Sequence, residues 1–410
     1  MMTIEVSTDL RERLRSHFPA LASGTVFLEN AGGSQVPVQV ADRINSYLLE
    51  SYVQLGAGYE LSRRSTDLVG EAHAFVRLLM GGEGGEVILG ASASSLLHML
   101  ADCYSKVLES GLEVIVAQTG HEANIGPWTR LERYGIQTRW WEMDPENFAC
   151  SLNQLEDLLS DRTALVAFPH VSNLLGEIVD VRRITALAHD AGARVVVDGV
   201  AFAPHRAMHV ADWGVDWYVY STYKVYGPHM AALWGHSDAL GELTGPNHFF
   251  IHEVPYQFEL GGPSHEGCAG LLGLADYLKV VAGLDGTASL SRSEIERAFE
   301  VMTACEQPLQ ARLLEYLGSR KDVRIVGPAG DSPTRVGTIS FVHSEKSSRT
   351  ITEVVDRSTV AIRHGHMYAY RLCQALDLDP DDGVVRVSLV HYNTPEEIER
   401  LVGVLDLALG

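Results

Sequence analysis

The sequence lacks the features of secreted, membrane-spanning and zinc-binding proteins. Only five cysteines occur among its 410 residues, and none has a Cys-x-x-Cys or other zinc-ligand spacing. No apolar run approaches the length that crosses a bilayer, and the opening stretch MMTIEVSTDLRERLRSHF has no apolar signal core. We therefore expect a cytoplasmic protein with reduced thiols, no structural metal and no membrane partner.

Basic residues are also scarce. The chain has 32 lysines and arginines against 53 aspartates and glutamates, a formal net charge of -21. Binding to nucleic acid requires clustered cations that neutralise phosphates, so we expect no nucleic-acid partner. Hydrophobic residues make up 46% of the chain. A chain of this length and composition buries a large core and is typical of two domains.

Short β-branched runs alternate with helical patterns through the first two thirds of the chain. Between two of the runs, the stretch DVRRITALAHDAGA has apolar residues at helical spacing and a glycine near its end, which is typical of a βαβ crossover. The pattern predicts an α/β fold with a mostly parallel sheet. The expected strands are Glu86–Leu89, Glu113–Ala117, Ala164–Phe168, Arg194–Asp198 and Asp216–Tyr220.

The pattern changes after about residue 290. A long helical stretch is followed by three apolar runs, VRIVG, VGTISFVH and VVRVSLVHYN, and then by a helix that begins at Pro395. We predict a large domain over residues 21–288 and a smaller α+β domain over 289–410. A helix within residues 1–20 is expected to pack on the smaller domain.

Chemically useful residues follow the predicted strands, where ligands of an α/β sheet bind. They comprise an anion-binding loop before a helix, an imidazole, an amide, a carboxylate and a lysine. This set suits a phosphorylated pyridine aldehyde, because lysine forms a Schiff base with the aldehyde and a carboxylate keeps the pyridine nitrogen protonated. The residues are Ser92, Ala93, Ser94, His121, Asn173, Asp198 and Lys224.

Each of these residues also has an ordinary structural interpretation. Lys224 can be a solvated surface residue, Asp198 and Ser92 can cap helices, and His121 can be a hydrogen-bonded histidine. Asn173 can hold a turn, and Arg386 can pair with Asp382.

Several spaced motifs, in order, resemble one family. They are FLENAGGSQVP, then VSNLLGEIVDVRRITALAHDAGARVVVDGVAFAPHR, STYKVYGP, FELGGPSHEG and VRVSLVHYNTPEEIERL. This order resembles the class V aminotransferase and cysteine desulfurase-like group of fold-type I enzymes, which use pyridoxal 5'-phosphate. The resemblance covers most of the chain and implies a large domain with a smaller C-terminal one. It also implies a homodimer with the site at its interface.

The resemblance implies a role for each candidate residue. Lys224 would hold the cofactor as a Schiff base, Asp198 would pair with the pyridine nitrogen, and His121 would stack on the ring. Asn173 would approach the phenolic oxygen. The phosphate would be held by Ser92, Ala93, Ser94, Ser221 and Gly262, and the amino-acid substrate by Asn30, Ala31, Arg363 and Arg386. Tyr59 is a separate candidate for contact with the substrate side chain.

Departures from the family pattern bear on the reaction. Tyr368 stands where a desulfurase has its persulfide-forming cysteine, and Cys373 falls in a predicted amphipathic helix as a buried thiol. Tyr223 replaces the histidine before the lysine, Ala201 replaces a glutamine, and Gly262 replaces a threonine that completes the phosphate site from the partner subunit.

Without that thiol, we expect a carbon–sulfur lyase that β-eliminates a cysteine S-conjugate to a thiol, pyruvate and ammonia. Tyr368 would then act as a proton donor. Decarboxylation-coupled oxidative deamination and transamination remain open, as does a catalytically silent binding protein. Further side chains considered for substrate contact are Arg63, Arg64, His265 and Tyr370.

Overall fold

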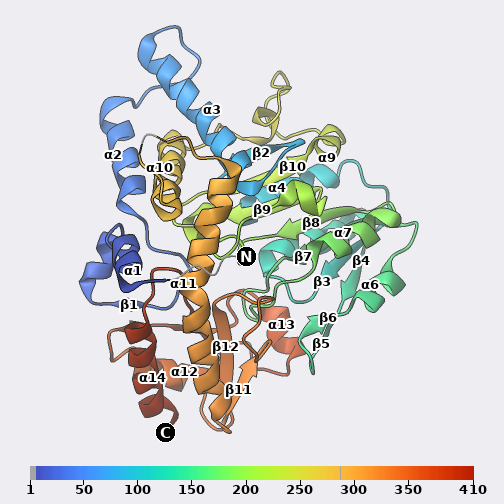
Figure 1. Ribbon diagram of the computed structural model, residues 1–410. Coiled ribbons are helices and arrows are strands. Elements are labelled where there is room, and N and C mark those ends of the chain that lie inside the picture. Colours follow the sequence, from blue (N-terminus) through green and yellow to red (C-terminus); the bar gives the residue numbers. More distant parts are fainter. Residues whose placement is uncertain (1–5, 287) are drawn as a thin grey trace.

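A seven-stranded sheet forms the larger part of the protein (Figure 1). The structure, a computed structural model, describes residues 6–286 and 288–410. In the sheet, β10 runs antiparallel to both of its neighbours, whereas the other strands run parallel to one another, so their carboxyl ends share one edge. The strand order is β2 (Gly85–Gly90), β10 (Ala231–His236), β9 (Trp217–Ser221), β8 (Arg194–Asp198), β7 (Thr163–Pro169), β3 (Glu113–Ala117) and β4 (Gln137–Trp141).

The five predicted strands are confirmed as β2, β3, β7, β8 and β9. Two further strands, β10 and β4, were not predicted. The run AALWGH of β10 is rich in alanine and glycine, which are depleted in strands. The run QTRWW of β4 lies at the sheet edge and is only half buried, so it lacks a continuous apolar signature.

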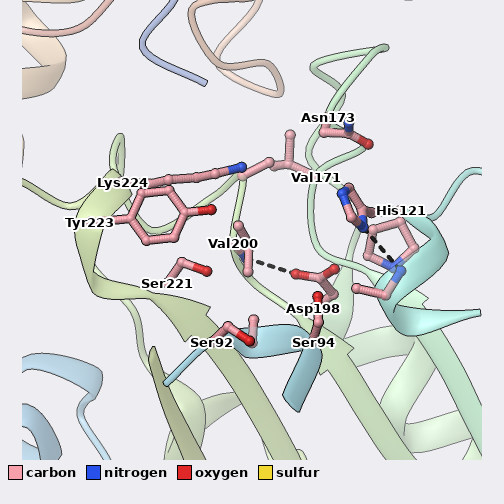
Figure 2. A pocket seen from close by; sticks show the side chains of 14 residues that line it. Ser92, Ser94, His121, Val171, Asn173, Asp198, Val200, Ser221, Tyr223 and Lys224 are labelled. Carbon is pink, nitrogen blue, oxygen red and sulfur yellow. Dashed lines mark hydrogen bonds between the residues drawn. The ribbon is translucent and has the colours of Figure 1, made fainter. Parts of the chain in front are cut away.

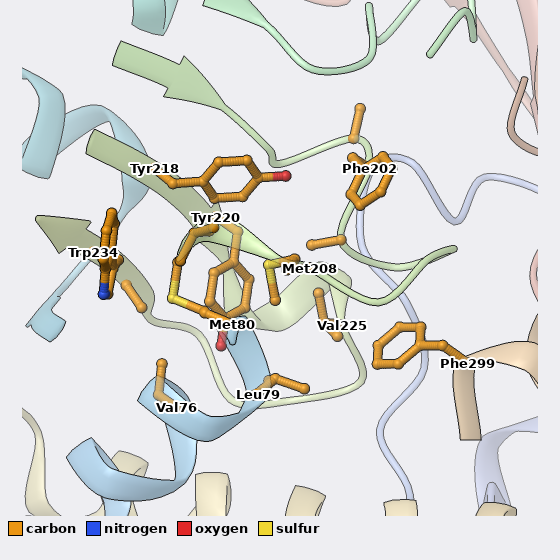
Figure 3. Packing of buried hydrophobic residues seen from close by; sticks show 14 of the residues in the cluster. Val76, Leu79, Met80, Phe202, Met208, Tyr218, Tyr220, Val225, Trp234 and Phe299 are labelled. Atoms are coloured by element: carbon orange, nitrogen blue, oxygen red, sulfur yellow. The ribbon is translucent and has the colours of Figure 1, made fainter. Parts of the chain in front are cut away.

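Helices cover both faces of this sheet. Val195 and Val197 of β8 join the core under one face, and Val196 joins the core under the other. Figure 3 shows Tyr218, Tyr220 and Trp234 packed near side chains of α3 in the first of these cores. Burial on both faces explains why the strands read as unbroken apolar runs. The first core includes α2 (Val38–Glu50), α3 (Glu60–Met80), α7 (Val181–Asp190) and α10 (His265–Ala282); the second includes α4 (Ala93–Tyr104), α5 (Gly126–Thr129) and α9 (Ser237–Gly241).

A four-stranded antiparallel sheet forms the smaller part. Its order is β11 (Val323–Val326), β12 (Thr338–His343), β15 (Val384–Ser388) and β14 (Arg363–Gly365). A core on one face includes α11 (Arg292–Ser319), α12 (Ser348–Val355) and α14 (Pro395–Leu409), and α13 (Tyr370–Ala375) contributes to a separate core. The predicted strands and the two long helices of this region are confirmed, and Cys373 is buried in α13 as expected.

The N-terminal segment contacts both parts. In α1 (Thr8–Arg15), Arg15 Nη2 donates to Glu397 Oε1 of α14 at 2.9 Å, while Leu14 is buried in a core shared with α10. The strand β1 (Val26–Phe27) pairs in parallel with β13 (Val360–Ala361) of the smaller part. The boundaries at residues 20 and 288 stay predictions, but by its pairing β1 belongs with the smaller part.

The remaining elements are short connections. None of the helices among residues 6–286 and 288–410 is both long and apolar enough to cross a membrane. The short connecting elements are η1 (Pro19–Ser23), η2 (Glu122–Asn124), η3 (Arg130–Tyr134), β5 (Met143–Asp144), β6 (Ala149–Cys150), α6 (Leu152–Leu158), α8 (Val210–Trp213), η4 (Thr222–Lys224) and η5 (Tyr256–Phe258).

Candidate active site

The carboxyl ends of five strands meet around one cavity (Figure 2). The loops after β2, β3, β7, β8 and β9 each contribute to its wall, and the space free of protein atoms is about 520 Å³. The structure therefore brings together candidate residues that are far apart in the sequence. The lining consists of Ser92, Ala93, Ser94, His121, Ala123, Pro169, Val171, Asn173, Asp198, Val200, Ala201, Ser221, Tyr223 and Lys224.

The loop after β2 ends at the N-terminus of α4. Ser92 is the N-cap, and its hydroxyl accepts a hydrogen bond from the Ser95 amide at 3.1 Å. The first amides of a helix have no partner within the helix, so they point outward and favour an anion. The capping role of Ser92 and an anion-binding role of the following turn are therefore compatible.

Asp198 and Lys224 follow neighbouring strands. Asp198 is buried at the end of β8, and its Oδ1 accepts a hydrogen bond from the Val200 amide at 2.9 Å. Burial raises the pKa of this carboxyl, whereas the Val200 amide and the Lys224 ammonium oppose the rise. Burial, together with the Arg386 guanidinium, lowers the pKa of Lys224 to about 8. The pKa values of both groups therefore differ from those of the same side chains in water.

His121 faces the cavity in an uncharged form. Its Nδ1 accepts a hydrogen bond from the Ala123 amide at 3.0 Å, which assigns the ring proton to Nε2. Burial, followed by the charges of Lys224 and Arg386, lowers the pKa of His121 to about 4. Figure 2 shows Lys224 and His121 reaching toward the cavity from opposite sides, with Asp198 below. A neutral imidazole here can lie against an aromatic ring.

Arg386 reaches this region from β15 of the smaller part. Its Nη1 donates to the Asn173 carbonyl at 3.2 Å, and Asn173 Nδ2 donates to the Met367 carbonyl at 2.8 Å. Arg386 Nε and Asn173 Oδ1 are buried without a hydrogen-bond partner. A buried polar atom left unpaired costs about 1–3 kcal/mol. The two atoms therefore indicate a polar ligand that completes the site.

Arg363 is engaged elsewhere. It stands opposite Arg386 in the register of β14 and β15, and its Nε pairs with Glu29 Oε1 at 2.9 Å. Burial lowers the pKa of Arg386 to about 10, with Glu29 opposing and Arg363 adding to this shift. Glu29 was not among the predicted residues, because only the folded chain brings it to Arg363. Arg386 thus keeps the greater capacity to bind a carboxylate.

Five other predicted residues do not line the cavity. The side-chain Nδ2 of Asn30 donates to the Phe27 and Ser388 carbonyls at 2.9 Å each. The backbone amide of Ala31 donates to Ser388 Oγ at 2.8 Å. These contacts join the N-terminal segment to β15. Tyr59 is half exposed at the start of α3, and Gly262 lies in a loop with a φ of +79°. Tyr368 is 65% exposed, but its ring centroid lies 5.2 Å from that of His121.

Tyr223 is a cavity residue that the sequence indicated only as a departure. Its ring lines the cavity and stacks on His229, with centroids 4.4 Å apart. Val171 and Val200 were not predicted, although their positions just after β7 and β8 could have identified them. Arg63, Arg64, His265 and Tyr370 are not part of the cavity wall.

The family model for aminotransferase class-V matches residues 26–401, which include every cavity residue. The chain belongs to the class-V aminotransferase family. Over 409 residues it is 37% identical to the aminotransferase-like protein FGM3 of Gibberella zeae, covering 97% of this chain and 98% of that protein. It is 30% identical to the cysteine desulfurase-like protein ustD of Aspergillus flavus, covering 96% of this chain and 90% of that protein.

The solved structures agree on the fold. The apo cysteine desulfurase from Thermococcus onnurineus NA1 superposes with a TM-score of 0.86 at 24% identity, covering 100% of this chain and 99% of that one. This member of the class-V aminotransferase family therefore has the fold-type I architecture that the sequence predicted. Members of the family use pyridoxal 5'-phosphate. The residues present fit that group, because the cavity combines a buried amine, a buried carboxylate, a neutral imidazole and a helix N-terminus.

Proposed function

We propose that this class-V aminotransferase family member is a carbon–sulfur lyase that acts on cysteine S-conjugates. It would break the bond between the β-carbon and sulfur, releasing a thiol, and the remaining fragment would be hydrolysed to pyruvate and ammonia. The observation that carries the proposal is Tyr368, whose ring lies beside His121 at the position that the family resemblance gives to a sulfur-accepting cysteine. A phenol cannot form a persulfide, so once the carbon–sulfur bond breaks, the sulfur leaves with its substituent.

The cysteines of the chain support this proposal. Cys103, Cys268, Cys305 and Cys373 are buried, and Cys150 is partly buried. Burial raises the pKa of Cys373 to about 11 and that of Cys150 to about 12. Because the thiolate is the nucleophile, these thiols react poorly at neutral pH.

The cofactor-binding residues would divide into three groups. Ser92, Ser94 and the first amides of α4, with Ser221, would bind the phosphate. Asp198 would hold a proton on the pyridine nitrogen, and neutral His121 would lie against the ring. When bound, pyridoxal 5'-phosphate supplies the electron sink that lets a proton leave the substrate α-carbon.

Arg386 and Lys224 would then act on the substrate. The Arg386 guanidinium, with its unpaired Nε, would bind and orient the α-carboxylate. The Lys224 amine would take the α-proton, and its lowered pKa leaves more of it neutral near physiological pH than for an ordinary lysine. As the carbon–sulfur bond breaks, the electron pair leaves with sulfur, and the Tyr368 hydroxyl would protonate the thiolate.

The products test the proposal directly. We expect purified enzyme with bound cofactor to release thiol and pyruvate in equal amounts from cysteine S-conjugates, and enzyme pre-treated with iodoacetamide to keep this activity. Carbon dioxide or an aldehyde without thiol would instead support decarboxylation-coupled deamination. Accumulation of a keto acid that retains the sulfur would support transamination, and no product from any compound would support a silent binding protein.

Substitution of Tyr368 separates proton transfer from packing. We expect Tyr368→Phe to lower kcat by about tenfold or more with little change in substrate binding, within the range for general acid catalysis. The measurement is steady-state thiol release with the wild-type protein as reference. An unchanged kcat would assign Tyr368 to packing. Tyr368→Cys should not desulfurate free cysteine efficiently, because persulfide chemistry also needs a lowered thiol pKa.

We further propose that the protein works as a homodimer in the cytoplasm, with Gly262 and Tyr59 contributing to the partner's site. Both residues lie outside the cavity of their own chain. The segment before Gly262 exposes Phe249, Phe250 and Leu260 at 89%, 64% and 64%. Exposed apolar side chains of this size favour a covering partner. Five unpaired cysteines suit a reducing compartment.

A further inference from the structure

Three aromatic side chains are joined in a series of ring contacts that starts at His121, a residue of the cavity wall. They are His366, Tyr368 and Tyr370, called here the aromatic rim. The ring centroid of Tyr368 lies 5.2 Å from that of His121, and His366 lies 6.2 Å from Tyr368 and 5.5 Å from Tyr370. Tyr368 and Tyr370 are 65% and 44% exposed. The rim thus offers open aromatic faces next to a residue that lines the cavity.

The backbone fixes the position of the rim. Met367 and Tyr368 have φ angles of 47° and 62°, in the left-handed region that residues other than glycine seldom adopt. The Met367 carbonyl accepts from Asn173 Nδ2, and the Tyr368 carbonyl accepts from the Glu122 amide, each at 2.8 Å. Such conformations persist only where surrounding contacts enforce them, and they concentrate at functional sites. Because the backbone that carries Tyr368 is already fixed, a ligand that binds against this ring would lose little free energy in ordering it.

Tyr368 also belongs to the wall of an open depression. It holds about 1020 Å³ of space outside protein atoms, and its wall includes Ile362, Met367 and Pro380. The arginine in its wall, Arg363, is already paired with Glu29. Asp356 and Asp381 also line it and would repel an anion. The depression is large enough for the part of a substrate that extends beyond the sulfur.

We propose that the aromatic rim is a subsite for a planar, uncharged aromatic substituent on the substrate sulfur. The inference rests on the proposed function and names the class of conjugate that this function would use. Aromatic pairs favour offset-stacked or edge-to-face contact, which a saturated ring of equal size cannot reproduce. The carboxylates of Asp356 and Asp381 disfavour an anionic substituent, and Arg363, whose charge is already balanced by Glu29, offsets them little.

A matched pair of compounds tests the subsite. S-benzyl-L-cysteine and S-(cyclohexylmethyl)-L-cysteine both carry alkanethiol leaving groups, so they differ mainly in planarity. Binding is measured by calorimetry on the Lys224→Ala protein supplied with pyridoxal 5'-phosphate, which separates binding from turnover. We expect the benzyl compound to bind about three- to tenfold tighter. S-(4-carboxybenzyl)-L-cysteine should bind more weakly than the benzyl compound.

Substitutions in the rim should remove the preference. Tyr368→Asn, added to the Lys224→Ala protein, is the first variant, because asparagine tolerates the left-handed conformation at this position. Tyr370→Leu is the second, and Tyr134→Leu is the control, since Tyr134 is 45% exposed outside the rim. We expect the binding ratio to approach one in the first variant, to fall in the second and to persist in the control.

Equal binding of the two compounds by the protein with an intact rim would overturn the subsite. A ratio that survives both rim substitutions, or tighter binding of the carboxybenzyl compound, would do the same. Failure of the proposed function gives a different result. In that case no compound yields thiol with the wild-type enzyme, whereas the binding preference for benzyl is still measurable.

Discussion

Lys224→Ala should abolish turnover. Only an amine can form the covalent link to the cofactor aldehyde, and in our proposal the same amine takes the α-proton. We expect thiol release to fall by at least about a thousandfold. General acid–base catalysis by one group alone contributes about 10²–10⁴-fold, and the variant also loses the covalent link to the cofactor. The absorbance band of the Schiff base between the cofactor and Lys224 should disappear as well. Steady-state kinetics and an absorbance spectrum measure the two effects.

The fold of this variant should survive. Burial lowers the pKa of Lys224 to about 8 from its ordinary value of 10.5. A lysine whose pKa is depressed on folding destabilises the native state, fully below the folded pKa and not at all above the unfolded one. At neutral pH, alanine removes this cost and offsets the packing that it loses. The cofactor-free variant should therefore melt within a few degrees of the wild type.

A second lysine provides the control. Lys106 pairs with Asp102 on the exposed surface of the large part, at 2.9 Å. Lys106→Ala should keep full activity and the same melting temperature, since exposed ion pairs contribute little. A Lys224→Ala protein that retains turnover would remove Lys224 from the mechanism, and the proposal of Schiff-base chemistry at this residue with it.

Asp198→Asn should lose about a hundredfold or more in rate while keeping its structure. The asparagine Oδ1 can still accept the hydrogen bond from the Val200 amide that Asp198 accepts at 2.9 Å. The negative charge is lost, and a neutral amide cannot hold the pyridine nitrogen protonated. The substitution therefore changes the charge and little else. Thiol release and the bound-cofactor absorbance are the measurements.

Asp198→Ala is the useful comparison, because it removes both the charge and the acceptor for Val200. If it melts earlier than Asp198→Asn while the two are equally slow, the charge acts in catalysis and the hydrogen bond acts in folding. Full turnover by the asparagine variant would contradict the role proposed for Asp198.

Positions that depend on strand ends could be predicted from the sequence. Ser92, His121, Asp198 and Lys224 each follow an apolar run, and parallel strands bring such residues to one edge of the sheet. The strand pattern of the fold was readable for the same reason, since burial on both faces leaves unbroken apolar runs. The unpredicted strands β4 and β10 lack that signature.

Contacts between distant segments could not be predicted. The pairing of Arg363 with Glu29 depends on how β1 pairs with β13 and how Glu29, just after β1, bridges to Ser388 of β15, and no local pattern encodes it. The side-chain Nδ2 of Asn30 links β1 to β15 through the Phe27 and Ser388 carbonyls, which no local pattern indicates, and its substrate contact stays a prediction. The left-handed backbone at Tyr368 likewise follows from contacts with Asn173 and Glu122 that sequence periodicity does not reveal.

The entire wall of the cavity comes from one continuous stretch of chain, Ser92 to Lys224, whereas Arg386 and Tyr368 come from the smaller part. The residues proposed to hold the cofactor and those proposed to act on the substrate carboxylate and sulfur therefore lie in separate parts of the chain. A mutation after residue 290 can change Arg386 or Tyr368, which we propose to act on the substrate, while every residue of the cavity wall stays the same. In a chain divided this way, the choice of substrate can be altered through the C-terminal part without loss of the cofactor site.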